Sequence, residues 1–263
     1  MSSVKTLEEH IAFAKQFARV SFYFARKWLT VQCPGVPLSQ LIKDRTPLLY
    51  HILEIPMEDW DTDPAGLAIL ARADLLSHLS PEEFEEELLS FAAPFIRETA
   101  IRTYPDVIGV TAPASWNCCS LKYDPPKAEL PADWVVFHIN NSIGPKSIFD
   151  VPDYLPHCFL LLMKEAEIRF GSTTLYTGTW LNGREDFLQY FPQEWRDNLT
   201  PSIPIPQIPH WHFGFWGQLI TGKGTINPKT EAFLRENGTM KYPCYSSHCS
   251  FENMRRHLKE NFL

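Results

Sequence analysis

The spacing of apolar residues changes near Asp106, and the change leaves few fold classes open to this chain. Before Asp106, apolar residues recur every three or four positions over long stretches, the first from about Leu7 to Leu29. After Asp106, short runs alternate between apolar and other residues, which is typical of strands. We therefore predict an α+β protein, in which a mixed β-sheet is packed with helices and the N-terminal portion is helical.

Prolines and capping residues set the element boundaries in the N-terminal portion. Residues 46–64 hold three prolines and are predicted to form a loop. Asp63 is expected to cap a second helix over residues 64–78, which has a proline at its first position. Residues 80–83 form a capping-box pattern that opens a third helix, and Pro94 is expected to kink or break it.

The second portion of the chain contains four predicted strands and four predicted helices. The strands cover residues 106–111, 134–139, 173–181 and 210–220. The helices cover residues 152–169, 184–197, 228–237 and 250–261. Because no repeat or flexible linker divides the chain, we predict a single domain over residues 1–263, with a helical portion of about 1–105 and a sheet-containing portion of about 106–263.

Charge and composition exclude two classes of partner and indicate a compartment. The chain has 24 Lys and Arg against 31 Asp and Glu, a net charge of −7, which argues against binding to nucleic acid. No apolar run reaches the roughly 18 residues of a membrane span. The polar, acidic start lacks the pattern of a leader peptide, and the six cysteines then indicate thiols in a reducing compartment. We predict a soluble, cytoplasmic protein and leave its oligomeric state open.

Three of the predicted strands place aromatic and neutral hydrogen-bonding groups on one face. Successive strand side chains point to opposite faces, so every second residue shares a face. These faces hold His210, His212, Gly214, Trp216 and Gln218 in one segment; Trp134, Val136, His138 and Asn140 in another; and Tyr176, Gly178, Trp180 and Asn182 in the third. Leaving buried amides and imidazoles without partners costs roughly 1–3 kcal/mol each. A small-molecule pocket with aromatic walls would supply such partners, although these groups can also satisfy one another inside an ordinary core.

The histidines allow two kinds of chemistry on that face. His138, His210 and His212 are candidate acid–base groups, because imidazole moves protons near neutral pH. His210 and His212 also have a spacing that can chelate iron or zinc, with His138 or His248 as the third ligand. The sequence leaves the cofactor open between none, iron and zinc.

The cysteines allow a third kind of chemistry. Cys118, Cys119 and Cys249 lie in polar segments, and a nucleophilic cysteine paired with His248 is an alternative to inert buried thiols. Which of them is reactive is left open by the sequence.

These observations predict an enzyme that acts on a small, partly apolar or aromatic organic molecule by histidine acid–base chemistry. The reaction would be an isomerisation, cyclisation or dehydration, and a biosynthetic step is the expected setting. The predicted substrate-binding residues are Asn140, Tyr176, Trp180, Asn182, Trp216 and Gln218. A metal-dependent enzyme that uses His210 and His212, and a small-molecule-binding protein without activity, are the two alternatives.

Overall fold

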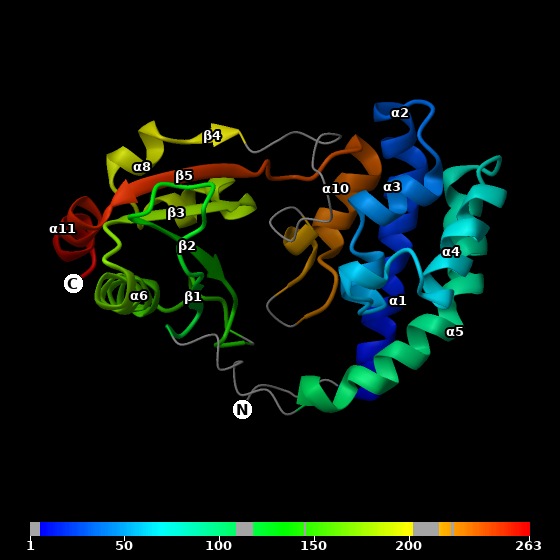
Figure 1. Cartoon of the computed structure of the whole chain (residues 1–263), viewed down its shortest axis with the longest axis horizontal. Coiled ribbons are helices and arrows are strands. Elements are labelled where there is room, and N and C mark those ends of the chain that lie inside the picture. The colour runs from blue at the N-terminus through cyan, green and yellow to red at the C-terminus, as the bar shows by residue number, and fades with distance from the viewer. Residues whose placement is uncertain (1–5, 109–117, 145, 202–215, 222–223) are drawn as a thin grey trace. The chain divides into compact units, whose positions relative to one another are not determined.

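The computed structural model of the chain describes residues 6–108, 118–144, 146–201, 216–221 and 224–263, with backbone alone for 106–108 (Figure 1). The chain forms two compact units. The helical unit comprises Val4–Val110 and Ile203–Lys241, and the sheet unit comprises Met1–Ser3, Thr111–Ser202 and Tyr242–Leu263. This organisation confirms the α+β class and the helical N-terminal portion. The single-domain prediction stays a prediction, because two compact units do not show whether either folds alone.

The helical unit is built around the long helix α5, which lies along α1. Its elements are α1 (Leu7–Phe24), the π-helical turn η1 (Ala25–Leu29), α2 (Thr30–Gln32), α3 (Leu38–Arg45), the π-helical turn η2 (Leu48–Ile52), the 3-10 turn η3 (Met57–Asp59), α4 (Pro64–Leu75), α5 (Pro81–Ile108), the 3-10 turn η5 (Gly217–Leu219) and α10 (Pro228–Asn237). In the predicted loop 46–64, Pro47 and Pro56 stand immediately before η2 and η3. Proline is tolerated at that position, so the loop prediction is wrong for these two turns.

Capping residues begin the helices where the sequence places them. Asp63 accepts a hydrogen bond from the backbone N–H of Gly66 at the start of α4. Ser80 and Glu83 form the predicted capping box of α5. At the other end of α10, Gly238 adopts φ +69, and a Cβ built there would lie 2.1 Å from the ring of Trp28. The caps predicted at Asp63 and Ser80 are therefore present at the start of α4 and α5.

Pro94 does not break α5, which continues through it and through Pro105. Phe84, Leu88, Ala92, Ile96 and Ala100 are buried at a spacing of four along this helix. Burial of this stripe outweighs the loss of single backbone hydrogen bonds at the prolines. The strand predicted for 106–111 is therefore wrong at residues 106–108, which belong to α5, and its remaining residues lie outside the described ranges.

The strand predicted for residues 210–220 is wrong at residues 216–219, whereas Ile220 forms an antiparallel β-bridge with Ile226. Gly217–Leu219 form η5, a 3-10 turn. Trp216 is buried between the rings of Phe17 and Phe24, and its indole N–H donates to the carbonyl oxygen of Arg45 at 3.0 Å. These contacts within the helical unit fix a turn conformation at a segment whose local sequence favours a strand.

The sheet unit contains a five-stranded mixed sheet with strand order β1-β2-β3-β5-β4. Its elements are β1 (Leu121–Tyr123), β2 (Trp134–Ile139), α6 (Tyr154–Phe170), β3 (Thr174–Thr179), the 3-10 turn η4 (Trp180–Gly183), α7 (Glu185–Leu188), α8 (Gln193–Asp197), β4 (Thr200–Pro201), β5 (Tyr245–Ser250) and α11 (Phe251–Asn261). Strands β2 and β3 are parallel and joined through α6, and the other pairs are antiparallel. The helix predicted over 184–197 is divided into α7 and α8, because Pro192 caps the second of them.

One face of the sheet forms the core of this unit. Val135, Phe137, Leu175 and Cys249 are fully buried on it. Helices α6, α8 and α11 contribute the other side of the same core, with Phe159, Trp195 and Met254 among the buried residues. Phe137 packs edge-on against Phe159, and Trp195 stacks on Phe191 with ring centroids 4.1 Å apart. The sheet therefore has one fully covered face and one that carries no such core.

Within the residues that the structure describes, no helix combines the length and the apolar character needed to cross a membrane.

Candidate functional site

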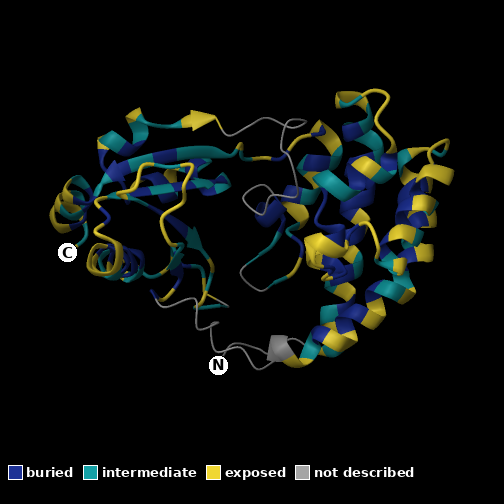
Figure 2. Cartoon of the chain, viewed as in Figure 1, coloured by how far each residue is buried: buried dark blue, intermediate teal, exposed yellow. Residues whose placement is uncertain are grey.

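The candidate site is the second face of the sheet, which we call the half-buried face. The strand register places side chains from β1, β2, β3 and β5 on it. The residues of the half-buried face are Lys122, Asp124, Trp134, Val136, His138, Thr174, Tyr176, Gly178, Ser246, His248 and Ser250. Burial alternates along β3 between these residues and the core (Figure 2). Apart from Val136, every one of them keeps part of its surface accessible.

Three rings cluster on the half-buried face. Trp134 stacks on the imidazole of His248, with ring centroids 4.3 Å apart and planes inclined by 30°. The ring of Tyr176 lies 5.6 Å from that of Trp134, with planes inclined by 34°. The rings come from β2, β3 and β5, so the cluster exists only when the three strands pair. It offers a partly exposed aromatic surface suited to stacking with a planar molecule.

His138 and Asp124 form a hydrogen-bonded pair on the same face. The backbone N–H of Asp124 donates to the carbonyl oxygen of Val136, which extends the β1–β2 ladder by one position. One carboxylate oxygen of Asp124 lies 2.8 Å from Nε2 of His138 and 3.0 Å from Nζ of Lys127. Partial burial works to raise the pKa of Asp124, but the hydrogen bonds from His138 and Lys127 outweigh it and hold the pKa below its usual value. The hydrogen bond to this carboxylate fixes the orientation of the His138 ring.

The structure brings together two of the predicted site residues, His138 and Tyr176. Asn140 follows β2, is exposed, and donates its backbone N–H to Ser120. β3 ends at Thr179, so strand alternation does not extend to Trp180 and Asn182. The predicted strand 173–181 is therefore too long, because the chain turns into η4 after Thr179.

Trp180 and Asn182 have partners on the core side of the sheet unit. The Asn182 amide donates to the carbonyl oxygens of Thr177 and Tyr245, and its oxygen accepts from the indole N–H of Trp195. The ring of Trp180 lies 5.6 Å from the guanidinium of Arg184, which also contacts the ring of Tyr242. These contacts give both residues a structural role, and the substrate-binding role predicted for them stays a prediction.

The remaining predicted site residues belong to residues 203–241, the second segment of the helical unit. Trp216 and Gln218 are buried in the helical unit, near α3 and α1 in the case of Trp216. His210 and His212 lie outside the described residues, so the iron or zinc site predicted from their spacing stays a prediction. Among the residues that the structure does describe, no three His, Cys, Asp or Glu side chains are arranged to hold a metal ion.

The three cysteines left open by the sequence differ in their surroundings. Cys249 is fully buried in β5, and burial raises the pKa of its thiol. Cys118 is also buried, which raises its pKa to about 11. Cys119 is exposed. Burial and raised pKa values are typical of inert thiols, which leaves Cys119 as the accessible one.

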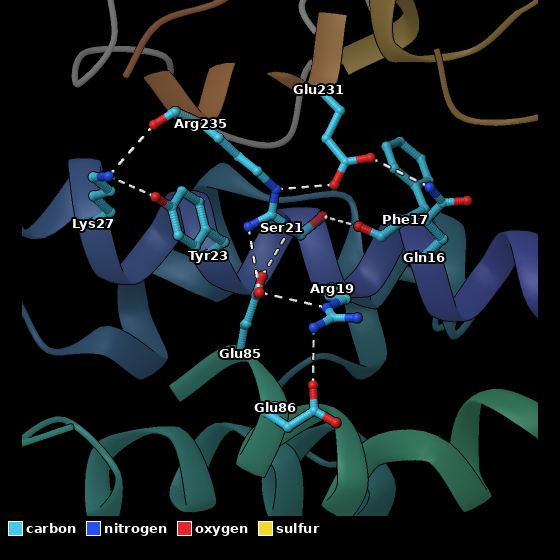
Figure 3. Close-up of polar contacts among 10 residues, drawn as sticks. All are labelled: Gln16, Phe17, Arg19, Ser21, Tyr23, Lys27, Glu85, Glu86, Glu231 and Arg235. Carbon is cyan, nitrogen blue, oxygen red and sulfur yellow. Dashed lines mark hydrogen bonds and ion pairs between the residues drawn. The ribbon is translucent and has the colours of Figure 1, made fainter. Parts of the chain in front are cut away.

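A second polar cluster lies in the helical unit, where α1, α5 and α10 meet (Figure 3). Glu85 is buried there and binds Arg235 through both carboxylate oxygens, at 3.3 and 3.0 Å, and Arg19 at 3.4 Å. Burial alone would lower the pKa of Arg235, but its hydrogen bonds to Glu85 and Glu231 raise it. A cleft of about 600 Å³ opens beside these groups. In this cluster Arg19 and Arg235 pair with glutamates from the other helices or their own, so the cluster is suited to joining three helices.

Several of these contributions are not found by sequence reasoning. Asp124 and Lys127 lie in a proline-rich stretch that shows no strand pattern, although an acidic residue ahead of a strand histidine is a weak signal. His248 lies in β5, which is not among the strands predicted from the sequence, because only two of the six residues of this strand are apolar. Glu85 belongs to an acidic run that is typical of a solvated first turn.

Comparisons of this chain with protein-family models, with curated proteins and with solved structures found no match.

Proposed function

We propose that the half-buried face of the sheet unit binds a small, planar, aromatic or partly apolar organic molecule, and that His138 acts on it by acid–base chemistry. The reaction class is an isomerisation, cyclisation or dehydration, for which a positioned proton donor and acceptor is enough. The observation that carries the proposal is the presence of a stacked aromatic cluster and a His–Asp pair on one accessible face.

The spacing along β2 matches the size of such a molecule. Residues two apart on a strand are separated by about 7 Å, and residues four apart by about 13 Å. Tyr176 pairs with Val136, one such step from His138, and Trp134 lies two steps away. A molecule of two or three fused rings that stacks beside Tyr176 and Trp134 therefore reaches the imidazole of His138.

His138 has the surroundings of a proton-transfer group. Its Nε2 is held by Asp124, while its side chain keeps 41% of its surface accessible to a ligand. In this pair the carboxylate orients the imidazole and stabilises its protonated form during the transfer. Asp124 is thus a positioning residue, and His138 is the catalytic residue.

All six cysteines are free thiols in the structure, which supports the reducing, cytoplasmic setting that we propose for this chemistry.

Binding is tested by titrating the protein with 2-naphthoate, a planar aromatic probe, in an isothermal calorimeter. Trp134→Leu is expected to weaken binding by about tenfold, because stacking on an aromatic ring is worth about 0.5–1.5 kcal/mol beyond buried area. Phe170→Leu, which changes a partly exposed ring at the end of α6, is the control and is expected to leave the affinity unchanged. Equal affinity for wild type and Trp134→Leu would refute binding at this face.

Proton transfer is tested with 4-nitrophenyl acetate, whose hydrolysis releases a coloured phenolate. His138 would take a proton from the attacking water as the ester C–O bond breaks, giving acetate and 4-nitrophenolate. His138→Gln is expected to remove most of the protein-dependent rate, and His157→Gln, at an exposed position of α6, to keep it. If both variants retain the rate while naphthoate still binds, the face is a binding surface without activity.

A further inference from the structure

Two hydrogen-bonding side chains of the half-buried face have no bonding partner among the residues that the structure describes. Tyr176 and His248 stand opposite each other on β3 and β5. Within the described ranges, no hydrogen bond joins the phenol hydroxyl of Tyr176 or either ring nitrogen of His248 to another group. By contrast, the hydroxyl of Tyr154 in the same unit lies 2.8 Å from Oγ of Ser120. Tyr176 and His248 are partly accessible, so both side chains are open to a ligand.

The aromatic cluster keeps these two side chains close together. Cross-strand partners of an antiparallel pair have Cβ atoms about 4.5–5.5 Å apart. The ring of His248 is stacked on that of Trp134, which in turn lies 5.6 Å from the ring of Tyr176. A phenol hydroxyl donates one hydrogen, and an imidazole donates an N–H in both its neutral and its protonated form. The cluster therefore presents two neighbouring donors, which a carboxylate with its two acceptor oxygens can bind together.

The charge of the half-buried face also favours an acidic ligand, although the whole chain has a net charge of −7. Among the residues that define this face, Asp124 is the acidic one, and its carboxylate is bound by Lys127 at 3.0 Å. Lys122 lies on the same face, opposite His138. Two lysines therefore accompany a single carboxylate here, and a ligand with a negative charge meets a locally positive surface.

We propose that the ligand of the half-buried face is an aromatic carboxylate, and that Tyr176 and His248 bind its carboxylate group. This inference rests on the proposed function and narrows its substrate to acids. Val136 pairs with Tyr176, and His138 follows Val136 by two positions on β2, so one strand step of about 7 Å separates the carboxylate from the imidazole of His138. The far end of the ring system therefore lies beside His138, and the proton is transferred there rather than at the carbon that carries the carboxylate.

The experiment compares 2-naphthoate with 2-naphthamide, which has the same rings but no charge, by isothermal calorimetry on the full chain. The wild type is expected to bind the naphthoate about tenfold more tightly, because hydrogen bonds to a charged group are about twice as strong as neutral ones. Tyr176→Phe and His248→Phe keep an aromatic ring but lose the hydrogen-bonding group, so each should reduce this preference by about threefold or more. Tyr123→Phe is the matched control, since Tyr123 lies on the core face and packs edge-on against Phe170, and it should keep the full preference.

Two results would overturn the inference alone. One is equal affinity of the wild type for the two probes, which leaves binding of a planar molecule at this face intact. The other is a preference for naphthoate that persists unchanged in both Tyr176→Phe and His248→Phe, since other groups would then bind the carboxylate. If neither probe binds the wild type, the proposed function fails together with this inference. The comparison of the two probes uses the wild-type chain, so it does not depend on whether a variant folds.

Discussion

Glu85→Gln is expected to destabilise the helical unit far more than Glu86→Gln, although the two residues are neighbours in one acidic run. The Glu85 side chain is 6% exposed and binds two guanidinium groups, whereas that of Glu86 is 63% exposed and binds Arg19 alone. Removing one partner of a buried ion pair costs about 3–5 kcal/mol, because the remaining charge stays buried. Here the cost is lower, about 2–3 kcal/mol by the same reasoning, since Arg235 is 27% exposed and keeps Glu231 at 3.0 Å. Removing an exposed pair costs about 0–1 kcal/mol.

Urea denaturation followed by far-UV circular dichroism measures this difference. With a slope of about 3 kcal/mol per molar urea, the midpoint for Glu85→Gln should fall by about 0.7–1 M. The midpoint for Glu86→Gln should move by no more than about 0.3 M. High salt should reduce the small effect of Glu86→Gln and leave that of Glu85→Gln nearly unchanged, because buried pairs are screened less. Equal midpoints for the two variants would refute the reasoning that burial and double pairing make Glu85 a structural clamp.

Three further outcomes are expected. Gly238→Ala should destabilise the protein by more than about 3 kcal/mol in thermal unfolding, and Gly171→Ala by about 1 kcal/mol. Both glycines have a positive φ, but only at Gly238 would the added Cβ lie 2.1 Å from the ring of Trp28. Asn182→Ala should cost about 2–3 kcal/mol in urea, because it removes three hydrogen bonds, two of them buried and one partly buried. Asn140→Ala, at an exposed position, should cost less than about 0.5 kcal/mol, and similar costs for the two variants would contradict the structural role of Asn182. The pKa of Cys118 is raised to about 11 by burial, so its contribution to stability is complete below the unfolded thiol value of about 8.5 and is lost as pH rises to 11. Cys118→Ala should therefore show a shallower fall in urea midpoint than wild type between those pH values, and parallel curves would contradict the raised pKa.

Local signals in the sequence predict much of the helical unit. The capping residues Asp63 and Ser80 begin α4 and α5 where expected, and the apolar spacing from Leu7 to Leu29 forms α1 and η1. These features depend on residues within a few positions of one another, so the sequence alone specifies them. The effect of the prolines is predicted wrongly, because burial of the apolar residues along α5 stabilises the helix by more than each missing hydrogen bond costs. These residues are buried only when α1 packs against α5, which local sequence does not show.

The candidate site is predicted less well, because its parts come from separate strands. Alternation along 134–139 correctly separates the core residue Phe137 from His138. It does not show that Asp124 and His248 join the same face. That depends on strand pairing between residues 14 positions apart for Asp124 and His138, and 72 positions apart for Tyr176 and His248. At Trp216 the error is a predicted element that does not form. The sequence predicts a strand, but the chain forms a turn there because the ring packs in the core of the helical unit.

The strand order has a consequence for how the chain acquires its fold during synthesis. β5 lies between β3 and β4, yet it is made after the whole second segment of the helical unit, residues 203–241. Until residues 245–250 leave the ribosome, β3 has an unpaired edge, and the hydrogen-bonding groups along it are open to other chains. A nascent chain stopped before Tyr245 should therefore aggregate through this edge or require a chaperone to cover it. Because the ring of His248 arrives with β5, the aromatic cluster is among the last parts of the molecule to form.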